Sequence, residues 1–369
     1  MNLTNDERIV LTLDAGGTNF VFSAIQGGKE MVESLTLPAS GATLEDVLKN
    51  IISGFEQVST LLSKKAAAIS FCFPGPAEYE DGIIGDLANL PTFRGGVALG
   101  PMLENIFQIP VFIRNDGDLF TYGEAIAGLL PEINHLLKKR HSPKRYGNLF
   151  GATFGTGFGG GVVSRGALLP GDNSASGEIN RLRNKRYPLY SVEESVSIRG
   201  IKNVFMRESG ISAASCPEPR EIFQIAMQKE AKNRQAAITA FQELAEVAGS
   251  ALADSISLID GLVVIGGGLS GAHPVFLQKL VDEMNHAYDT PGGNKLDRME
   301  IRAYNLENPE ELNLFLQGDA REIKVPFFDQ KITYDPVKRI GVGISRLGTV
   351  KAVSAGAYAY AIHQLDQQK

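Results

Sequence analysis

The sequence predicts an α/β protein of two lobes, each a mixed sheet flanked by helices. A chain of 369 residues is longer than one typical hydrophobic core supports. Each half opens on an apolar strand, a glycine turn and a returning strand, and stretches with helical spacing follow. We expect a smaller N-terminal lobe over residues 1–122, completed by a C-terminal helix at about 352–369. A larger lobe would occupy residues 123–351, with a cleft between the two.

The first half begins with three antiparallel strands, joined by a glycine turn and a Gly27-Gly28 hairpin. Apolar residues from Leu44 then recur at helical spacing, and Thr43 is placed to cap a helix of about five turns. Two buried strands follow, each running into a polar or Pro/Gly loop of the kind that often contacts ligands. The expected strands are Ile9–Leu13, Asn19–Ile25, Met31–Leu37, Ala66–Phe73 and Val111–Arg114.

The second half opens in the same way, which indicates a weak internal repeat. Strands are expected at Asn148–Phe154, Gly159–Ser164 and Gly261–Ile265. Helices are expected within Glu218–Ile259, from about Pro274 to Asn285, and at Ala352–Leu365. The stretch Pro291–Arg339 is polar and irregular, and its pattern assigns no element.

Composition excludes several classes of protein. A net charge of −6, with dense basic clusters only around Lys138–Arg145 and Arg181–Arg186, speaks against a nucleic-acid partner. No window of about 18 apolar residues predicts a membrane span, and the polar N-terminus does not resemble an export signal. Cys72 and Cys216 are the only cysteines, too few for a disulfide framework or a cysteine-rich zinc site. We therefore expect a cytoplasmic protein.

The first glycine turn, Asp14–Thr18, has the composition of a phosphate-binding loop. Gly16 and Gly17 allow positive φ and let backbone N–H groups approach phosphate oxygens. Thr18 adds a hydroxyl donor, and Asp14 is the candidate ligand for the Mg²⁺ that bridges two phosphates. An ordinary glycine hairpin is the structural alternative.

Two further glycine turns extend the pattern. The second half has a similar glycine turn, formed by Gly155, Thr156 and Gly157. The many glycines from this turn up to Gly161 suggest the close approach of a ligand. The alternative is a β-bulge or tight hairpin. A third turn at Gly266, Gly267 and Gly268 follows a buried strand and could hold the adenine and ribose; a plain strand-to-helix turn is equally compatible.

A carboxylate follows the strand Val111–Arg114. A sugar hydroxyl is a poor nucleophile, and an aspartate that accepts its proton is the usual remedy. Asp116 is our candidate for that base, with Asn115 orienting the sugar and Asp118 as the nearby competitor. A surface Asn-Asp-Gly turn is the alternative.

In order along the chain, these segments resemble the ROK family of sugar kinases and repressors, within the actin-like, ribonuclease H-like and hexokinase-type ATPase fold. Asp14–Thr18 and Gly155–Gly157 are similar to the family's two phosphate motifs, and Gly266–Gly268 to its adenosine motif. Asn115 with Asp116 looks like its sugar-holding and catalytic pair. The segments 73–76, with Gly75, and 89–91, with Asn89, are similar to its sugar-side loops.

The resemblance fails at one place. Gly177-Glu178-Ile179 looks like the start of the family's Gly-Glu-Ile-Gly-His signature, but Asn180 and Arg181 stand where Gly and His are usual. The cysteine cluster expected just downstream is also missing, so structural zinc is not expected. Glu178 and Glu193 still align with residues that touch the sugar in relatives; for Glu193 a solvated helix start is the alternative. Pairing with nearby acids could order this loop, through Arg181, Arg183 and Arg186.

The resemblance implies an ATP- and Mg²⁺-dependent hexose kinase, with glucose phosphorylated at its 6-hydroxyl as the first candidate reaction. Fructose, mannose or an N-acetylated amino sugar are alternative substrates, because the altered Asn180-Arg181 leaves sugar specificity open. The family's repressors carry a helix-turn-helix module before the first phosphate turn, and only about a dozen residues precede Asp14 here. A sugar sensor without turnover stays open. Dimers are frequent in the family, so a homodimer also stays open.

Overall fold

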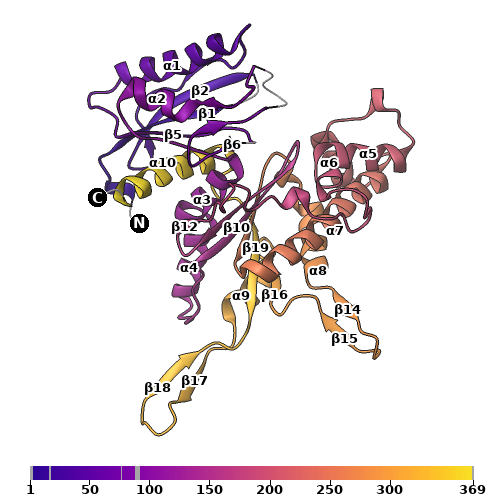
Figure 1. Ribbon diagram of the computed structural model, residues 1–369. Helices are drawn as coiled ribbons and strands as arrows, with labels where there is room; N and C mark the ends of the chain where they lie inside the picture. The colour runs from indigo at the N-terminus through magenta and orange to yellow at the C-terminus, as the bar shows by residue number, and fades with distance from the viewer. Residues whose placement is uncertain (1–2, 16–17, 76, 88–91, 368–369) are drawn as a thin grey trace. The chain divides into compact units, whose positions relative to one another are not determined.

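The computed structural model describes residues 3–15, 18–75, 77–87 and 92–367, and the chain divides into two compact units (Figure 1). The first contains Met1–Ala127, Leu168–Ser176 and Val350–Lys369. The second contains Gly128–Ala167 and Gly177–Thr349. In the part of the chain that the structure describes, no helix combines the length and apolar character needed to cross a membrane.

The sheet of the first unit has the strand order β3-β2-β1-β5-β9, and β4 also pairs with β2. β1 and β2 form an antiparallel hairpin, whereas β1, β5 and β9 run parallel, so the carboxyl ends of these three strands lie at one edge. The strands are β1 (Ile9–Ala15), β2 (Asn19–Gln26), β3 (Lys29–Glu30), β4 (Leu35–Pro38), β5 (Ala68–Cys72) and β9 (Val111–Arg114).

Helices pack on both faces of this sheet because successive side chains of a strand point to opposite faces. Ile9, Leu11 and Leu13 join one core with α1 (Leu44–Thr60) and α2 (Leu99–Phe107). Val10 joins another core with α10 (Thr349–Gln367). A small three-stranded sheet, β6 (Ala77–Glu78), β7 (Ile83–Ile84) and β8 (Val97–Ala98), completes the unit with α3 (Asp116–Ala127).

The close crossing of α3 and α10 depends on two glycines. A Cβ atom on Gly123 would clash with the backbone carbonyl of Ala352, and one on Gly356 with that of Leu119. The two helix backbones therefore approach more closely than side chains would allow.

The expected capping residue begins α1. The Thr43 hydroxyl accepts a hydrogen bond from the Asp46 N–H at 3.2 Å, and the Asp46 carboxylate accepts one from the Thr43 N–H at 3.0 Å. This reciprocal capping box satisfies two N–H groups that have no partner inside the helix. By contrast, the single third strand expected over Met31–Leu37 is wrong. The chain makes the short β3, leaves the sheet, and pairs again with β2 as β4.

The sheet of the second unit has the order β12-β11-β10-β13-β19-β16. β10 and β11 form the antiparallel hairpin, and β10, β13, β19 and β16 run parallel. Hairpin and parallel strands thus repeat the arrangement of the first unit, as the internal repeat predicted. The strands are β10 (Asn148–Phe154), β11 (Phe158–Ser164), β12 (Ala167–Leu168), β13 (Leu262–Gly266), β16 (Arg302–Asn305) and β19 (Arg339–Ile344).

One continuous core joins this sheet to its helices, with the long α7 at the centre beside α5 and α8 (Figure 1). The helical stretch expected over Glu218–Ile259 is interrupted at 228–233, where polar and charged residues separate α6 from α7 and Asn233 has a positive φ of 64°. The helices are α4 (Leu129–Lys139), α5 (Ile198–Ser209), α6 (Pro219–Met227), α7 (Arg234–Ile259), α8 (His273–Met284) and α9 (Pro309–Gln317).

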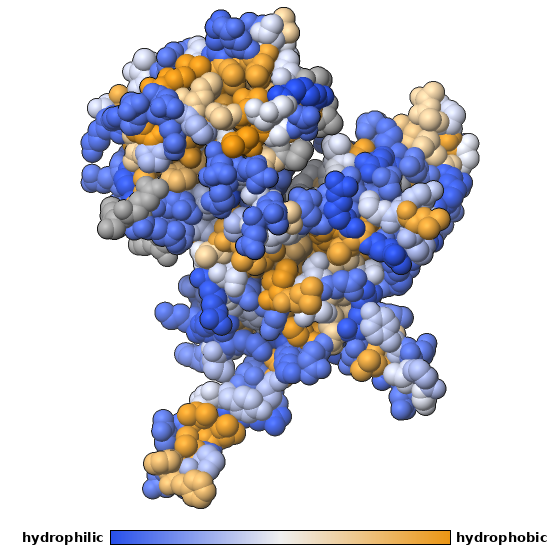
Figure 2. Space-filling view, viewed as in Figure 1, coloured by the Kyte–Doolittle hydropathy of each residue, from blue (hydrophilic) through white to orange (hydrophobic). Residues whose placement is uncertain are grey.

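The stretch without a sequence assignment, Pro291–Arg339, contains β16, α9, one strand of a first protruding hairpin and the whole of a second (Figure 1). One pairs β14 (Ala287–Asp289) with β15 (Lys295–Asp297), and the other pairs β17 (Arg321–Lys324) with β18 (Lys331–Tyr334). Apolar side chains are exposed on the second hairpin (Figure 2), including Phe327 and Phe328 at its end.

Candidate active site

The candidate residues of the first unit gather where three parallel strands end. Asp14 near the end of β1 pairs in register with Cys72 at the end of β5, and Cys72 pairs with Arg114 at the end of β9. Asp14 lies within β1 itself, and the segments that leave β5 and β9 carry Gly75 and the Asn115-Asp116 pair. Loops at the carboxyl edge of parallel strands are the usual place for ligand contacts in α/β proteins.

The charge of one carboxylate in this group affects the pKa of the other. Burial raises the pKa of Asp14, and the charge of Asp116 raises it further. The pKa of the Cys72 thiol is raised by burial and by the same two charges, so both carboxylates lie near that strand end. Negative charge is therefore concentrated at this edge, where a divalent cation would relieve the repulsion.

Asp116 is the first residue of α3 and keeps an exposed surface. Its Oδ1 accepts a hydrogen bond from the Gly117 N–H at 2.9 Å. Surrounding protein nevertheless disfavours the charged carboxylate and raises its pKa, which outweighs this hydrogen bond. A carboxyl group with a raised pKa is better suited to accept a proton than an ordinary aspartate.

The competitor Asp118 lies on the buried face of the same helix, with 5% of its surface exposed. Its charge contributes to raising the pKa values of Tyr79 and Tyr360, although burial is the main cause for both phenols. It therefore faces the interior of the unit, whereas Asp116 reaches solvent.

A tyrosine that sequence reasoning missed connects residues that were predicted to contact the sugar. The buried Tyr79 hydroxyl donates a hydrogen bond to the Phe73 carbonyl at 2.8 Å and shares a side-chain hydrogen bond with Asn115. Asn115 also accepts one from the Gly117 N–H at 2.8 Å, which fixes its amide group. A Cβ atom on Gly75 would stand 3.1 Å from the same hydroxyl. No pattern around Tyr79 marks it, because it lies among very short strands.

Three of the predicted residues, Gly16, Gly17 and Asn89, lie outside the described residues. Thr18 is described and exposed at the start of the returning strand, where its carbonyl accepts a hydrogen bond from the Ala39 N–H at 3.0 Å.

In the second unit, the predicted turn Gly155–Gly157 links β10 to β11. The Gly155 N–H donates to the Gly157 carbonyl at 3.0 Å, so this amide is used within the turn. A Cβ atom on Gly155 would meet open space. By contrast, one on Gly159 would meet the Thr153 side chain, and one on Gly160 the Gly177 carbonyl. The close approach that we attributed to a ligand is, at those two glycines, an approach of the chain to itself.

Glu193 lies directly at this turn. Its Oε2 accepts a hydrogen bond from the Phe158 N–H at 3.1 Å and would stand 2.5 Å from a Cβ atom on Gly157. Its Oε1 pairs with Arg199 at 3.3 Å. The structure thus joins a predicted sugar residue to a predicted phosphate turn. Glu178 is exposed, immediately before the short 3-10 helix Ile179–Arg181.

The third glycine turn packs against the first turn of this unit. Gly267 has a φ of +85°, and a Cβ atom there would clash with the Phe154 carbonyl. Its N–H donates to the Thr349 hydroxyl at 2.9 Å, and the Leu269 N–H donates to Phe154 at 3.0 Å. Gly266 is the last residue of β13.

A cavity of about 290 Å³ opens beside Gly268. Gly268 has open space where a Cβ would stand, and the aromatic rings of Phe223 and Phe241 meet edge to face there, 6.2 Å apart. Arg220 on α6 lines the same cavity. An aromatic wall, a cation and an exposed backbone are suited to a purine base with its ribose.

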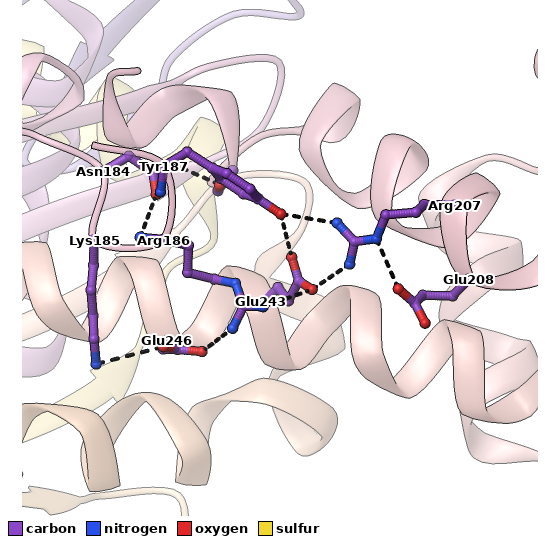
Figure 3. A network of polar contacts seen from close by, with 9 residues as sticks. Asn184, Lys185, Arg186, Tyr187, Arg207, Glu208, Glu243 and Glu246 are labelled. Atoms are coloured by element: carbon purple, nitrogen blue, oxygen red, sulfur yellow. Dashed lines mark hydrogen bonds and ion pairs between the residues drawn. The ribbon is translucent and has the colours of Figure 1, made fainter. Parts of the chain in front are cut away.

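The loop that departs from the family pattern is held by ion pairs (Figure 3). Of the three arginines expected to order it, Arg186 pairs with Glu246 at 2.6 Å and with Glu243 at 3.2 Å. Lys185, which no sequence pattern marked, pairs with Glu283 at 2.7 Å. Among the residues that the structure describes, no three His, Cys, Asp or Glu side chains gather as metal ligands would. That the protein has no structural zinc stays a prediction.

Two units of the same topology, each a hairpin continued by parallel strands under helices, define an actin-like ATPase fold. The chain belongs to the ROK family, whose sequence profile matches residues 10–304.

One solved structure, described as a glucokinase from Parabacteroides distasonis, is 54% identical with a TM-score of 0.91 and covers 98% of this chain and 99% of its own. A glucokinase of Thermotoga maritima is 25% identical over an alignment 302 positions long, which covers 74% of this chain and 87% of the relative. An N-acetyl-D-glucosamine kinase of Vibrio cholerae is also 25% identical, over 281 residues, 70% of this chain and 83% of the relative.

Proposed function

We propose that this protein is an ATP-dependent hexose kinase that phosphorylates glucose at its 6-hydroxyl. Family membership and the 54% identical glucokinase support the class of reaction. The observation that carries the mechanism is the position of Asp116, which combines an exposed surface with a raised pKa at the shared edge of three parallel strands.

In this proposal Asp116 accepts the proton of the attacking hydroxyl as the bond to phosphorus forms. Asn115, held by Gly117 and Tyr79, orients the sugar next to that carboxylate. Glu193 and Glu178 would bind further hydroxyl groups, and Gly75 would leave room for the ring.

The residues fit a magnesium nucleotide. Asp14 offers hard carboxylate oxygens where a like charge already raises its pKa, which is where Mg²⁺ binding is favourable. When bound, Mg²⁺ neutralises charge on the phosphates. The turn Gly155–Gly157 would face the phosphates, and the cavity beside Gly268 would hold the base. A cytoplasmic location and a homodimer stay predictions.

An N-acetylated amino sugar is the second candidate substrate, because the Vibrio cholerae relative is named an N-acetyl-D-glucosamine kinase. The departure at Asn180-Arg181 lies in the segment expected to contact the ring and leaves this choice open.

The deciding experiment is a coupled assay of ADP release with ATP and Mg²⁺ across glucose, fructose, mannose, N-acetylglucosamine and N-acetylmannosamine. We expect the highest kcat/KM for glucose. A maximum for an N-acetylated sugar would replace glucose and keep the reaction class. No sugar-dependent ADP release, from protein that binds glucose by calorimetry, would make the chain a sensor instead.

A further inference from the structure

The segment from Tyr187 to Arg207 carries two contacts to the turn Gly155–Gly157. Glu193 accepts the Phe158 N–H at the end of that turn. Five residues later, the Ile198 N–H at the start of α5 donates to the Gly155 carbonyl at 2.9 Å. The position of the turn and the position of Glu193 therefore depend on one stretch of chain.

Both ends of that stretch bind one carboxylate (Figure 3). Glu243 on α7 accepts from Arg207, the last basic residue of α5, and from Arg186 at 3.2 Å. The Tyr187 hydroxyl lies 3.4 Å from the other oxygen of Glu243 and accepts from Arg207 at 2.9 Å. Glu243 is 6% exposed, whereas the Arg207 and Arg186 side chains are 46% and 36% exposed, so these charge-assisted bonds lie at the boundary between core and solvent.

Packing alone holds this stretch weakly on its outer side. A cavity of about 730 Å³ borders it, lined by Tyr187, Arg207 and the intervening Leu189 and Tyr190. Leu189 is 96% exposed and Tyr190 is 60% exposed, so neither side chain anchors the loop in the core. Further along the stretch, Val192 and Val196 are buried in the core of the unit, so the polar bonds to α7 add order mainly at the exposed start of the stretch.

We propose that Glu243 is a positioning residue of the kinase, which holds both ends of the segment 187–207 and thereby places Glu193 and the Gly155–Gly157 turn. The inference rests on the proposed function. Glu243 acts through Glu193 and the turn, and itself touches neither sugar nor nucleotide.

A neighbouring residue on the same helix provides a matched control. Glu246 also pairs with Arg186, at 2.6 Å, and with Lys185 at 3.6 Å, but both partners lie immediately before Tyr187, next to one end of the segment only. Loss of its charge therefore releases one end only, while Arg207 and Tyr187 keep their bonds to Glu243.

The test compares Glu243→Gln with Glu246→Gln in steady-state kinetics of the full chain. We expect Glu243→Gln to raise KM for the hexose and for ATP roughly tenfold, since one charge-assisted bond contributes about that factor, with kcat within about threefold. Glu246→Gln should change each KM by less than about threefold. A role in folding alone would instead lower the active fraction, and so kcat, and leave both KM values unchanged.

Amide hydrogen exchange gives a readout that does not need activity. Glu243→Gln should speed exchange over 187–200, the Ile198 amide included, and Glu246→Gln should not. Equal exchange and equal KM values in the two variants would overturn the proposal.

Two milder variants keep the question open to refutation if Glu243→Gln does not fold. Tyr187→Phe removes the hydroxyl between Glu243 and Arg207, and Arg207→Lys removes the planar fork at a half-exposed side chain. Each variant should raise KM for the hexose and for ATP, as Glu243→Gln does. Unchanged KM values in both variants would refute the role of Glu243. A wild-type protein inactive on every hexose would defeat the proposed function. The exchange experiment would still test whether Glu243 orders the segment 187–207.

Discussion

The charge of Asp116 raises the pKa of Asp14, although the two residues stand more than a hundred positions apart in the sequence. β1, β5 and β9 bring them together, because the strands run parallel and end in register at Asp14, Cys72 and Arg114. Two neighbouring carboxylates repel one another and destabilise a protein, a cost that is typical of sites that bind a cation or transfer a proton.

Replacing Asp116 by Asn should lower kcat for hexose phosphorylation by roughly 10²- to 10⁴-fold, because the amide cannot accept the proton of the hydroxyl. ADP release under saturating sugar and ATP measures this loss. Asp118→Asn is the control, since this residue faces the interior and should affect stability more than kcat. A larger loss of kcat in Asp118→Asn would exchange the roles of the two aspartates.

The stability of the site should depend on pH in a defined direction. The folded-state pKa values of Asp14 and Asp116 are raised above the ordinary value of 3.8. Their ionisation therefore costs folding free energy that is absent at low pH and grows as the pH rises through the raised values. Asp14→Asn and Asp116→Asn should each raise Tm at pH 7, and the gain should shrink toward pH 4. Melting curves at several pH values check this, and an unchanged gain at pH 4 would contradict the assigned cause.

Removing the Tyr79 hydroxyl should weaken sugar binding. Tyr79→Phe leaves the ring in place but frees Asn115 and the Phe73 carbonyl from their shared partner. We expect KM for the hexose to rise by roughly three- to tenfold with a smaller change in kcat. The exposed Tyr334→Phe, in the protruding hairpin, is the matched control and should behave as wild type. Equal KM values in both variants would remove Tyr79 from the site.

Adjacent glycines of the third turn should respond in opposite ways to alanine. Gly267→Ala places a Cβ against the Phe154 carbonyl at a positive φ, and should cost roughly 2–4 kcal/mol of unfolding free energy. Gly268→Ala meets open space and should fold normally, but it would intrude on the cavity and raise KM for ATP. Denaturant melts and ATP titrations separate the two effects. A stable Gly267→Ala, or an unchanged KM in Gly268→Ala, would count against the respective role.

Strands were predicted correctly from the sequence where an apolar run lies between turn residues. The bounds expected for Val111–Arg114 and Asn148–Phe154 are those of β9 and β10, because both strands are apolar runs between strong turn residues. α3 was missed because its residues from Gly117 to Ala125 are buried on every side, so no amphipathic period marks the helix. Its start was hidden as well, since Asn115-Asp116-Gly117 also has the composition of a turn.

Other features of the structure could not be predicted, either because they depend on contacts between distant segments or because their strands are exposed. Glu243 lies within an Ala- and Leu-rich helix, and only the folded structure brings Arg186 and Arg207 to it. The hairpins within 287–334 were unassigned because their strands are largely exposed, so no buried alternation distinguishes them from a loop.

The packing of α10 on the sheet of the first unit affects how the protein folds during synthesis. Val10, Ile25 and Ala68 of the first sheet find their partners Tyr358, Ala361 and Ile362 only in the last helix of the chain. A ribosome must therefore translate the whole second unit before the first can cover one face of its sheet. Until then that face remains an apolar surface on the nascent chain, which is the kind of surface that chaperones bind.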